Sequence, residues 1–211
     1  MFITKILRKK KRPPVYAVSV DGTLAFELSE EVFVRFGLHT GGEITEKTVE
    51  QIVTTEALTR ATRTAVNYLS YRPRSSKETA QHLIRKGHSS ELARRVVQQL
   101  TRQGMINDLE FARMFVRDKV KRKPVGKALL RQSLLEKGIS PPVAEQVLKE
   151  YISDEEQQVA AEKLAARRLN LAHATFQKLD PVRRKKRLLE YLLRRGFSSE
   201  VAHKTVRAVL T

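Results

Sequence analysis

The segment Leu83-Ile84-Arg85-Lys86-Gly87-His88-Ser89 is the most informative part of this 211-residue chain, because closely similar segments occur at residues 134–140 and 192–198. The two later copies are Leu134-Leu135-Glu136-Lys137-Gly138-Ile139-Ser140 and Leu192-Leu193-Arg194-Arg195-Gly196-Phe197-Ser198. A basic residue complements the negative end of a helix, and a glycine just beyond it can adopt the left-handed conformation that closes the helix. A serine two residues later caps the next helix. Each copy therefore predicts a helix, a tight turn and a second helix.

The residues after each glycine share one apolar spacing. At offsets of 5, 6, 9, 10 and 13 residues from Gly87, Gly138 and Gly196, fourteen of the fifteen residues are apolar, and Thr205 is the exception. This spacing is typical of one face of a helix. A further amphipathic segment precedes each helix pair, over 56–71, 108–121 and 154–169. With the glycines 51 and 58 residues apart, the pattern predicts a three-helix unit that is present three times.

The expected fold is mainly α, with three tandem, helix-turn-helix-like repeats stacked in an elongated solenoid. A small unit precedes them, since residues 15–20 and 23–28 are β-prone and Asp21-Gly22 between them is a strong hairpin turn. Ser29 is expected to cap a short helix after this hairpin. The expected organisation is a basic arm over 1–14, a hairpin-plus-helix unit over 15–54, and repeats over 55–105, 106–152 and 153–211.

The charge of the chain points to a polyanionic partner. The formal net charge is +18 and the sequence pI is about 10.4. Residues 1–14 carry six Lys and Arg and no acid, residues 15–50 carry two against seven acids, and residues 51–211 carry 33 against 16, which gives +6, −5 and +17. A mobile basic arm that contacts the partner and a tail that only increases solubility are both open for residues 1–14.

The sequence lacks the residue patterns of the common catalytic and cofactor sites. It has no cysteine, which excludes disulfides and thiolate ligands and fits a reducing compartment such as the cytoplasm. Gly126-Lys127 lacks the upstream glycine of a phosphate loop, because Lys121 occupies that place. The five histidines are scattered singly. We therefore expect no enzymatic activity, no cofactor and no metal, and the longest apolar runs are too short for a membrane span.

Several short segments of the sequence together resemble the RecX family of recombination regulators. These segments are Tyr68-Leu69-Ser70-Tyr71-Arg72-Pro73-Arg74-Ser75, Gly104-Met105-Ile106-Asn107-Asp108 with Phe111-Ala112, Glu136-Lys137-Gly138-Ile139, and Arg194-Arg195-Gly196-Phe197. The resemblance covers about residues 56–211. Asn107 stands where the family usually has Asp, and because Asn caps a helix as well as Asp does, the departure does not alter the expected function.

The resemblance implies a function. Proteins of this family bind along the RecA–DNA filament and lower its recombinase, ATPase and coprotease activities, which places them in DNA repair and the SOS response. The expected partners are the RecA filament and single-stranded DNA, with double-stranded DNA as a further candidate. No membrane partner is expected, and the expected state is a monomer in the cytoplasm. Two alternatives stay open: a helical-repeat protein that binds DNA without a role specific to RecA, and a helical scaffold for another acidic protein.

The candidate contact residues are three basic groups. They are Arg72 and Arg74; Lys119, Lys121, Arg122 and Lys123; and Arg183, Arg184, Lys185, Lys186 and Arg187. The first group flanks a proline that should end a helix, so its members could instead cap helix carbonyls. The other two groups could instead be solvated helix faces.

Overall fold

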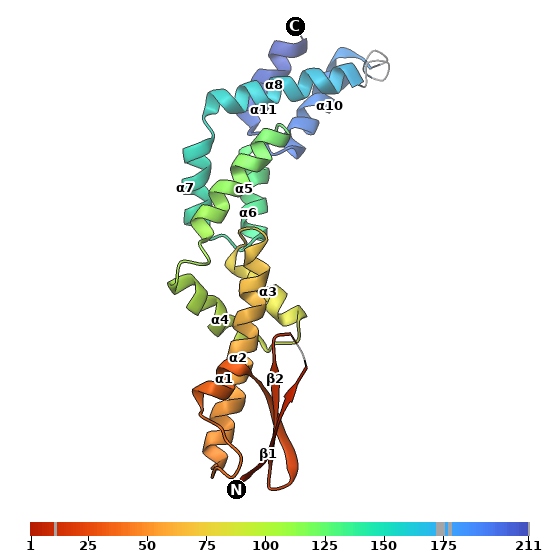
Figure 1. The fold of residues 1–211 in the computed structure, drawn as a ribbon. Helices are drawn as coiled ribbons and strands as arrows, with labels where there is room; N and C mark the ends of the chain where they lie inside the picture. The colour runs from red at the N-terminus through yellow and green to blue at the C-terminus, as the bar shows by residue number, and fades with distance from the viewer. Residues whose placement is uncertain (11, 172–175, 177–178, 211) are drawn as a thin grey trace. The chain divides into compact units, whose positions relative to one another are not determined.

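A computed structural model describes residues 1–10, 12–171, 176 and 179–210, and Figure 1 shows the order of the elements. The chain forms two compact units. Unit 1 contains Met1–Arg72 and Thr79–Arg102, and unit 2 contains Pro73–Glu78 and Gln103–Thr211. The predicted fold class is confirmed: three helical repeats follow a small β-containing unit in the sequence.

Unit 1 begins with a three-stranded antiparallel sheet in the order β1-β2-β3. The strands are β1 (Ile3–Lys9), β2 (Val15–Val20) and β3 (Thr23–Ser29). The predicted hairpin is present as β2 and β3. The prediction of a mobile arm over 1–14 was wrong, because Ile3–Lys9 pairs with β2. Ile3 is buried and Ile6 is half-buried, so apolar side chains fix a segment whose basic residues Lys5 and Arg8 remain exposed.

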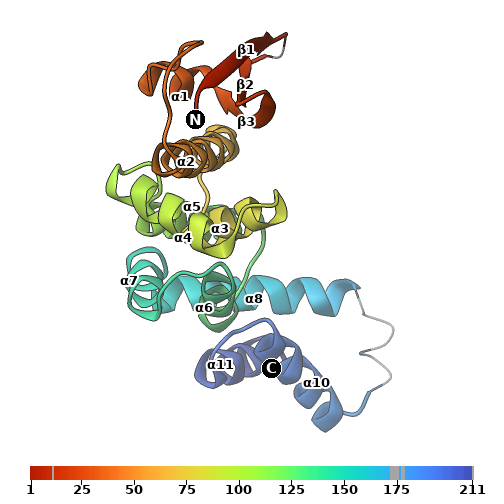
Figure 2. The same ribbon diagram turned by 90° about the horizontal axis from the view of Figure 1, so that it is seen from below.

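Two helices cover one face of the sheet, as Figures 1 and 2 show: α1 (Glu30–Arg35) and α2 (Glu46–Ser70). A hydrophobic core forms between the sheet and these helices, and it includes Val18, Leu28, Val32 and Ile52. Glu56 of α2 ties this layer together, because its Oε2 accepts hydrogen bonds from the Ser29 backbone N–H at 2.8 Å and from its hydroxyl at 2.7 Å. The domain boundary expected at 54/55 falls inside α2, which is one continuous helix.

The first repeat consists of α2, α3 (Ser76–Arg85) and α4 (Ser90–Arg102). Within unit 1, Ala61 and Ala65 of α2 are buried, as are Leu83 of α3 and Val96 of α4. Gly87 between α3 and α4 has φ 87°, the left-handed conformation that the sequence predicts for it. The first turn of α3 belongs to unit 2 and the rest of the helix to unit 1.

Unit 2 holds the second and third repeats. The second repeat consists of α5 (Asp108–Arg122), α6 (Lys127–Glu136) and α7 (Pro141–Tyr151), and the third contains α8 (Asp154–Leu171), α10 (Pro181–Arg194) and α11 (Ser199–Leu210). Each repeat has its own hydrophobic core, built on residues such as Phe111 and Leu134 in one and Leu188 and Phe197 in the other. Asn107 caps α5, since its side chain accepts hydrogen bonds from two backbone N–H groups at 3.1 Å. Separate cores, each closed by its own helix turn, are what the repeated sequence pattern predicts.

Within unit 2, the first turn of α3 contacts the turn after α6, and we call this contact the first joint. The Ser75 hydroxyl donates a hydrogen bond to the carbonyl oxygen of Lys137 at 2.7 Å. The Ser76 backbone N–H donates to Asp108 Oδ1 at 2.8 Å, and Lys137 Nζ lies 2.6 Å from Glu78 Oε1. Side chains therefore make most of the polar contacts of the first joint.

A corresponding contact, the second joint, forms between the first turn of α6 and the turn after α10. The Gly126 N–H donates to the carbonyl oxygen of Arg195 at 2.9 Å, and Lys127 N–H donates to Gln157 Oε1 at 2.9 Å. Here the two main chains touch, because a Cβ atom on Gly126 would lie 1.9 Å from the carbonyl carbon of Gly196. The second joint therefore depends on glycine at position 126.

Candidate functional site

A basic pocket of about 270 Å³ lies beside the second joint. It is lined by Lys123, Pro124, Leu164, Arg167, Arg168, Leu171, Tyr191 and Arg195. Four of these eight residues are cations, three are aliphatic and one is aromatic, and none is acidic. A pocket of this composition favours an anionic group attached to an apolar or aromatic one.

Tyr191 organises the basic side chains of the pocket. The Cζ atoms of Arg168 and Arg195 lie 5.2 and 5.5 Å from the centre of its ring, which is within the range of a cation–π interaction. Arg168 is half-buried on α8, and Arg195 is exposed at the end of α10. The ring therefore contacts guanidinium groups from two segments of chain, and both groups line the pocket.

Local sequence features bring Lys123 to the pocket. Lys123 ends α5, and its backbone N–H donates to the carbonyl oxygen of Lys119 at 3.2 Å. Pro124 cannot continue the helix, and the chain then enters the second joint, where Gly126 bonds to the main chain of Arg195. Lys123 and Arg195, which are 72 positions apart in sequence, line one pocket because of this joint.

The four cations of the pocket are not neutralised by the protein's own acids. Within the described part of the chain, no acidic side chain lies in salt-bridge distance of Lys123, Arg167, Arg168 or Arg195. Other basic residues of unit 2 do have such partners, as in Lys127 Nζ to Asp154 Oδ1 at 2.9 Å. The pocket therefore concentrates positive charge, which attracts an anionic ligand.

The first predicted group, Arg72 and Arg74, does not line the pocket. Arg72 is exposed at the end of unit 1. Arg74 is half-buried in unit 2, directly before the Ser75 that forms the first joint. Tyr71, their neighbour, is 85% exposed.

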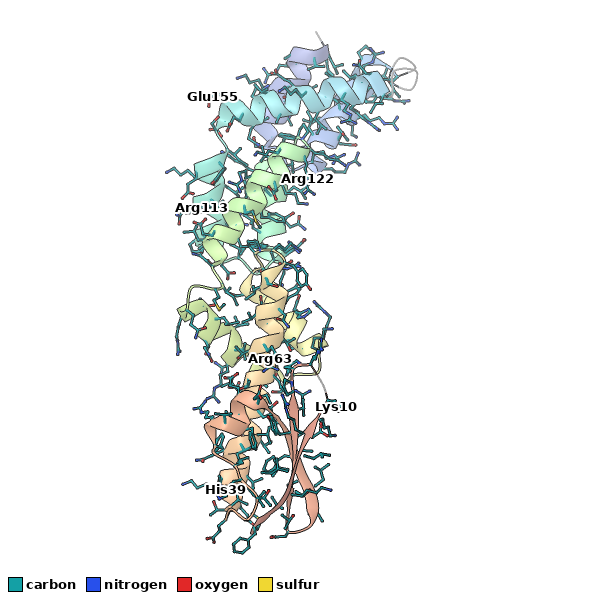
Figure 3. The ribbon with its side chains drawn as sticks, in the orientation of Figure 1. Lys10, His39, Arg63, Arg113, Arg122 and Glu155 are labelled. Atoms are coloured by element: carbon teal, nitrogen blue, oxygen red, sulfur yellow. The ribbon has the colours of Figure 1, made fainter. Side chains whose placement is uncertain are left out.

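The second predicted group lies at the C-terminal end of α5, where Figure 3 marks Arg122. Lys119, Lys121, Arg122 and Lys123 are all exposed. Lys119 Nζ lies 5.3 Å from the centre of the Phe115 ring. Lys123 lines the pocket and the other three do not. These cations also complement the negative end of α5, so they support the helix whatever they bind.

The third predicted group occupies the first turns of α10. Arg183 pairs with Asp180, with 3.2 Å between Nε and Oδ2, and Arg184 is half-buried and donates from Nη2 to the carbonyl oxygen of Leu179 at 3.3 Å. Lys185, Lys186 and Arg187 are exposed. None of the five lines the pocket, although Arg187 lies one helical turn before Tyr191 on the same face of α10.

Sequence reasoning missed most of the pocket, namely Arg167, Arg168, Tyr191 and Arg195. The candidate groups were runs of basic residues close in sequence, whereas the pocket takes its cations from three separate segments. One usable signal was present: Leu164, Arg168 and Leu171 lie at the spacing of one helix face, and so do Arg187, Tyr191 and Arg195.

A second cluster of charge links α5 to α7 and has a structural role. Arg113, labelled in Figure 3, donates from Nε to Glu150 Oε2 at 2.9 Å and from Nη1 to Glu110 Oε1 at 2.6 Å. The hydrogen bond from Arg113, followed by one from Gln146, lowers the pKa of the Glu150 carboxyl below its ordinary value. The hydrogen bonds of Arg113 to Glu150 and then to Glu110 raise the pKa of the Arg113 guanidinium. This cluster is neutralised internally, unlike the pocket.

The described residues offer neither a metal site nor a membrane span. Among them, no three His, Asp or Glu side chains come together in an arrangement that could hold a metal ion. In the same part of the chain, no helix has the length and apolar character needed to cross a membrane.

Comparison with known proteins identifies the family. The models of the first, second and third three-helix domains of RecX match residues 61–100, 107–148 and 154–206. Regulatory protein RecX of Listeria welshimeri is 30% identical over 96% of this chain and 73% of its own length. That of Leuconostoc mesenteroides is 31% identical over 99% of this chain and 76% of its own.

Solved structures agree with this result. A crystal structure of regulatory protein RecX superimposes with a TM-score of 0.78 at 27% identity and covers 98% of both chains. RecX from Lactobacillus salivarius, at 23% identity, has the same fold with a TM-score of 0.64 over 74% of this chain and 97% of its own. With all three domains matched and relatives about 30% identical along nearly its whole length, the chain belongs to the RecX family of regulatory proteins.

Proposed function

We propose that this protein binds the RecA–DNA nucleoprotein filament and lowers the recombinase, ATPase and coprotease activities of RecA. The observation that carries the proposal is the match of all three RecX domains. In this proposal the protein is a monomeric regulator in the cytoplasm that acts by binding and not by covalent chemistry.

The charge of the protein supports this mode of action. A nucleoprotein filament presents phosphates and protein surfaces at regular intervals, and residues 51–211 carry 33 Lys and Arg against 16 acids over three repeats. Several modest contacts on one chain add up to strong binding when they can form together. The protein then changes filament activity by binding one filament state more tightly than another, or by occupying the growing end.

The test is RecA-dependent ATP hydrolysis on single-stranded DNA. We expect this protein to reduce the hydrolysis rate at concentrations well below those of RecA and of DNA binding sites. Inhibition that appears only when the protein coats all of the DNA would contradict a filament-specific role. A complete absence of inhibition would remove the proposed function.

Direct DNA binding is a second candidate, and the basic pocket favours it. Cation–phosphate contacts release counterions, so affinity for single strands should fall with salt with a logarithmic slope of about −0.7 per phosphate contact. Co-sedimentation with RecA filaments at a salt concentration that abolishes binding to bare DNA supports filament recognition. If both interactions disappear at the same salt concentration, the protein acts on DNA alone.

The exposed cations that do not line the pocket are candidate contacts for the same partners. We propose that Lys119, Lys121 and Arg122 on α5, Lys185, Lys186 and Arg187 on α10, and Arg72 contact phosphate or an acidic filament surface. Their exposure leaves their charged groups available, whereas Arg74 and Arg184 are half-buried and Arg183 pairs with Asp180. Replacing Lys185, Lys186 and Arg187 with Gln should weaken DNA binding without changing the helical circular dichroism signal.

A further inference from the structure

The two joints of unit 2 occupy corresponding positions of successive repeats, and one of the differences between them concerns charge. A shift of 51 positions takes Ser75 to Gly126 and Glu78 to Leu129, and a shift of 58 takes Lys137 to Arg195. In the first joint, Glu78 pairs with Lys137 at 2.6 Å and its side chain is only 13% exposed. In the second joint Leu129 stands in the place of that acid.

Because residue 129 is a leucine, it offers Arg195 no carboxylate of the kind that Glu78 offers Lys137. The side chain packs on the turn after α10, since a Cβ atom on Gly196 would lie 2.6 Å from Leu129 Cβ. A leucine supplies contact area there and no charge. Arg195 instead lies over the ring of Tyr191, which Arg168 also contacts.

We propose that the pocket beside the second joint binds the phosphodiester backbone of single-stranded DNA. The four cations that line the pocket, Lys123, Arg167, Arg168 and Arg195, contact phosphate groups of the strand, and Tyr191 positions the guanidinium groups of Arg168 and Arg195. The proposal rests on the proposed function in that it names the DNA-contacting site of the regulator.

The chemistry of the side chains favours phosphate. A guanidinium presents a rigid, planar set of donors that matches two oxygens of one phosphate, and three of the four cations are arginine. The ring of Tyr191 holds two of these guanidinium groups before any ligand binds. Binding then costs less side-chain freedom, which increases affinity.

The pocket is small and partly apolar. Its volume of about 270 Å³ lies near the lower end of the range of about 300–1,000 Å³ that is usual for small-molecule pockets, so it can take one unit of a longer chain. Pro124, Leu164 and Leu171 provide the apolar floor against which a sugar or a base can lie.

The basic stripe on α10 favours a nucleic acid over an acidic peptide. Arg187, Tyr191 and Arg195 follow one another at four-residue spacing, so the positive charge continues away from the pocket along one helix face. A nucleic acid strand carries a charge on every unit and can follow such a stripe throughout its length. A peptide can do so only where acids happen to recur.

The test compares four variants of the full-length protein in binding to a 20-nucleotide oligo(dT), measured by fluorescence anisotropy over a range of NaCl concentrations. R168Q/R195Q should bind about tenfold or more weakly, because two charge-assisted hydrogen bonds to phosphate can no longer form. Its salt dependence should be less steep by about 0.7 for each phosphate that the variant no longer neutralises. L129E should also bind weakly, because the new carboxylate can pair with Arg195 as Glu78 pairs with Lys137.

Two variants serve as matched controls. R94Q/R95Q removes the same charge from α4 in unit 1 and should change oligo(dT) affinity much less. L129Q has the size of L129E without its charge and should retain most of the binding. Equal losses of affinity in R168Q/R195Q and R94Q/R95Q, with circular dichroism showing both folded, would overturn the proposal. So would equal losses in L129E and L129Q.

Binding to poly-glutamate and to duplex DNA tests the two alternative ligands, an acidic peptide and double-stranded DNA. If R168Q/R195Q retains oligo(dT) binding but loses binding to poly-glutamate, the pocket takes an acidic peptide and the proposal is wrong. If its affinity for a 20-base-pair duplex falls as much as that for oligo(dT), the site is not one for single strands. The RecA ATPase assay with the unmodified protein is independent: failure there removes the proposed function, whereas unchanged oligo(dT) binding by R168Q/R195Q removes only this site.

Discussion

The first and second joints dock the start of one helix on the turn after another, yet they achieve this contact differently. In the first, Ser75 bridges to the carbonyl of Lys137 through its hydroxyl, and Glu78 neutralises the Lys137 side chain. In the second, Gly126 brings its own N–H to the carbonyl of Arg195. In the first joint Glu78 and Lys137 pair with each other, whereas the second joint leaves the Arg195 side chain available to a binding partner. One docking geometry therefore serves stability at one place and exposes a basic pocket at the other.

The largest expected effect comes from adding one methyl group to the second joint. In G126A, the new Cβ would meet the Gly196 carbonyl carbon at 1.9 Å, so the two main chains must separate. We expect the free energy of unfolding to fall by about 3 kcal/mol, at the upper end of what overpacking costs. A urea unfolding curve measures it, and oligo(dT) affinity should fall in parallel as Lys123 moves away from Arg195. Unchanged stability would show that the joint is not a close main-chain contact.

A smaller effect is expected at the matching position of the first joint. S75A keeps the Cβ that this joint already accommodates and removes the hydrogen bond to the Lys137 carbonyl, so the cost should be about 1–2 kcal/mol. Since Ser75 is far from the basic pocket in sequence and does not line it, oligo(dT) affinity should be unchanged. A decrease in DNA binding as large as that in G126A would mean that the two joints do not have separate roles.

The ion pair that distinguishes the joints should contribute less still. E78Q retains the size of the side chain and removes the charge that faces Lys137, and we expect the free energy of unfolding to fall by about 1 kcal/mol because Lys137 is partly exposed. Stability in urea at low and high NaCl is the measurement. The difference between E78Q and the unmodified protein should shrink as salt screens the pair, and a salt-independent difference would point to packing instead.

The smallest expected effect concerns pH and the Arg113 cluster, which like Glu78 and Lys137 is neutralised within the protein. Because Arg113 lowers the pKa of Glu150 in the folded state, this carboxylate stabilises the fold above its ordinary value of 4.5. The contribution disappears as the pH falls through the lowered folded-state pKa. Urea midpoints should therefore decrease in acid more for the unmodified protein than for E150Q.

The matched control for this experiment is E155Q. Glu155 is exposed at the start of α8, as Figure 3 shows, and its replacement should leave the acid dependence close to that of the unmodified protein. If E150Q and E155Q have the same acid dependence, the bond between Arg113 and Glu150 does not contribute to stability in solution.

Much of the fold could be predicted because its signals are local. Gly87, Gly138 and Gly196 all adopt positive φ, as expected for glycines that close helices. The prediction of a mobile N-terminal arm failed for a physical reason. Ile3 and Ile6 are three residues apart, a spacing that puts them on opposite faces of a regular strand, but a register shift between Ile3 and Lys5 allows both to pack on the same core. The two-residue alternation of a strand is hidden by this irregularity and by the surrounding lysines.

The three helical repeats, the hairpin, the family and the excess of positive charge follow from the order of residues alone, because each depends on neighbours within a turn or two of chain or on composition. Which cations line one pocket follows from tertiary packing. Arg168 and Arg195 both contact the ring of Tyr191 within the third repeat, and Lys123 lines the same pocket because Gly126 allows two main chains to touch. Contacts between segments far apart in sequence arise from helix docking, and no local pattern of residues specifies them.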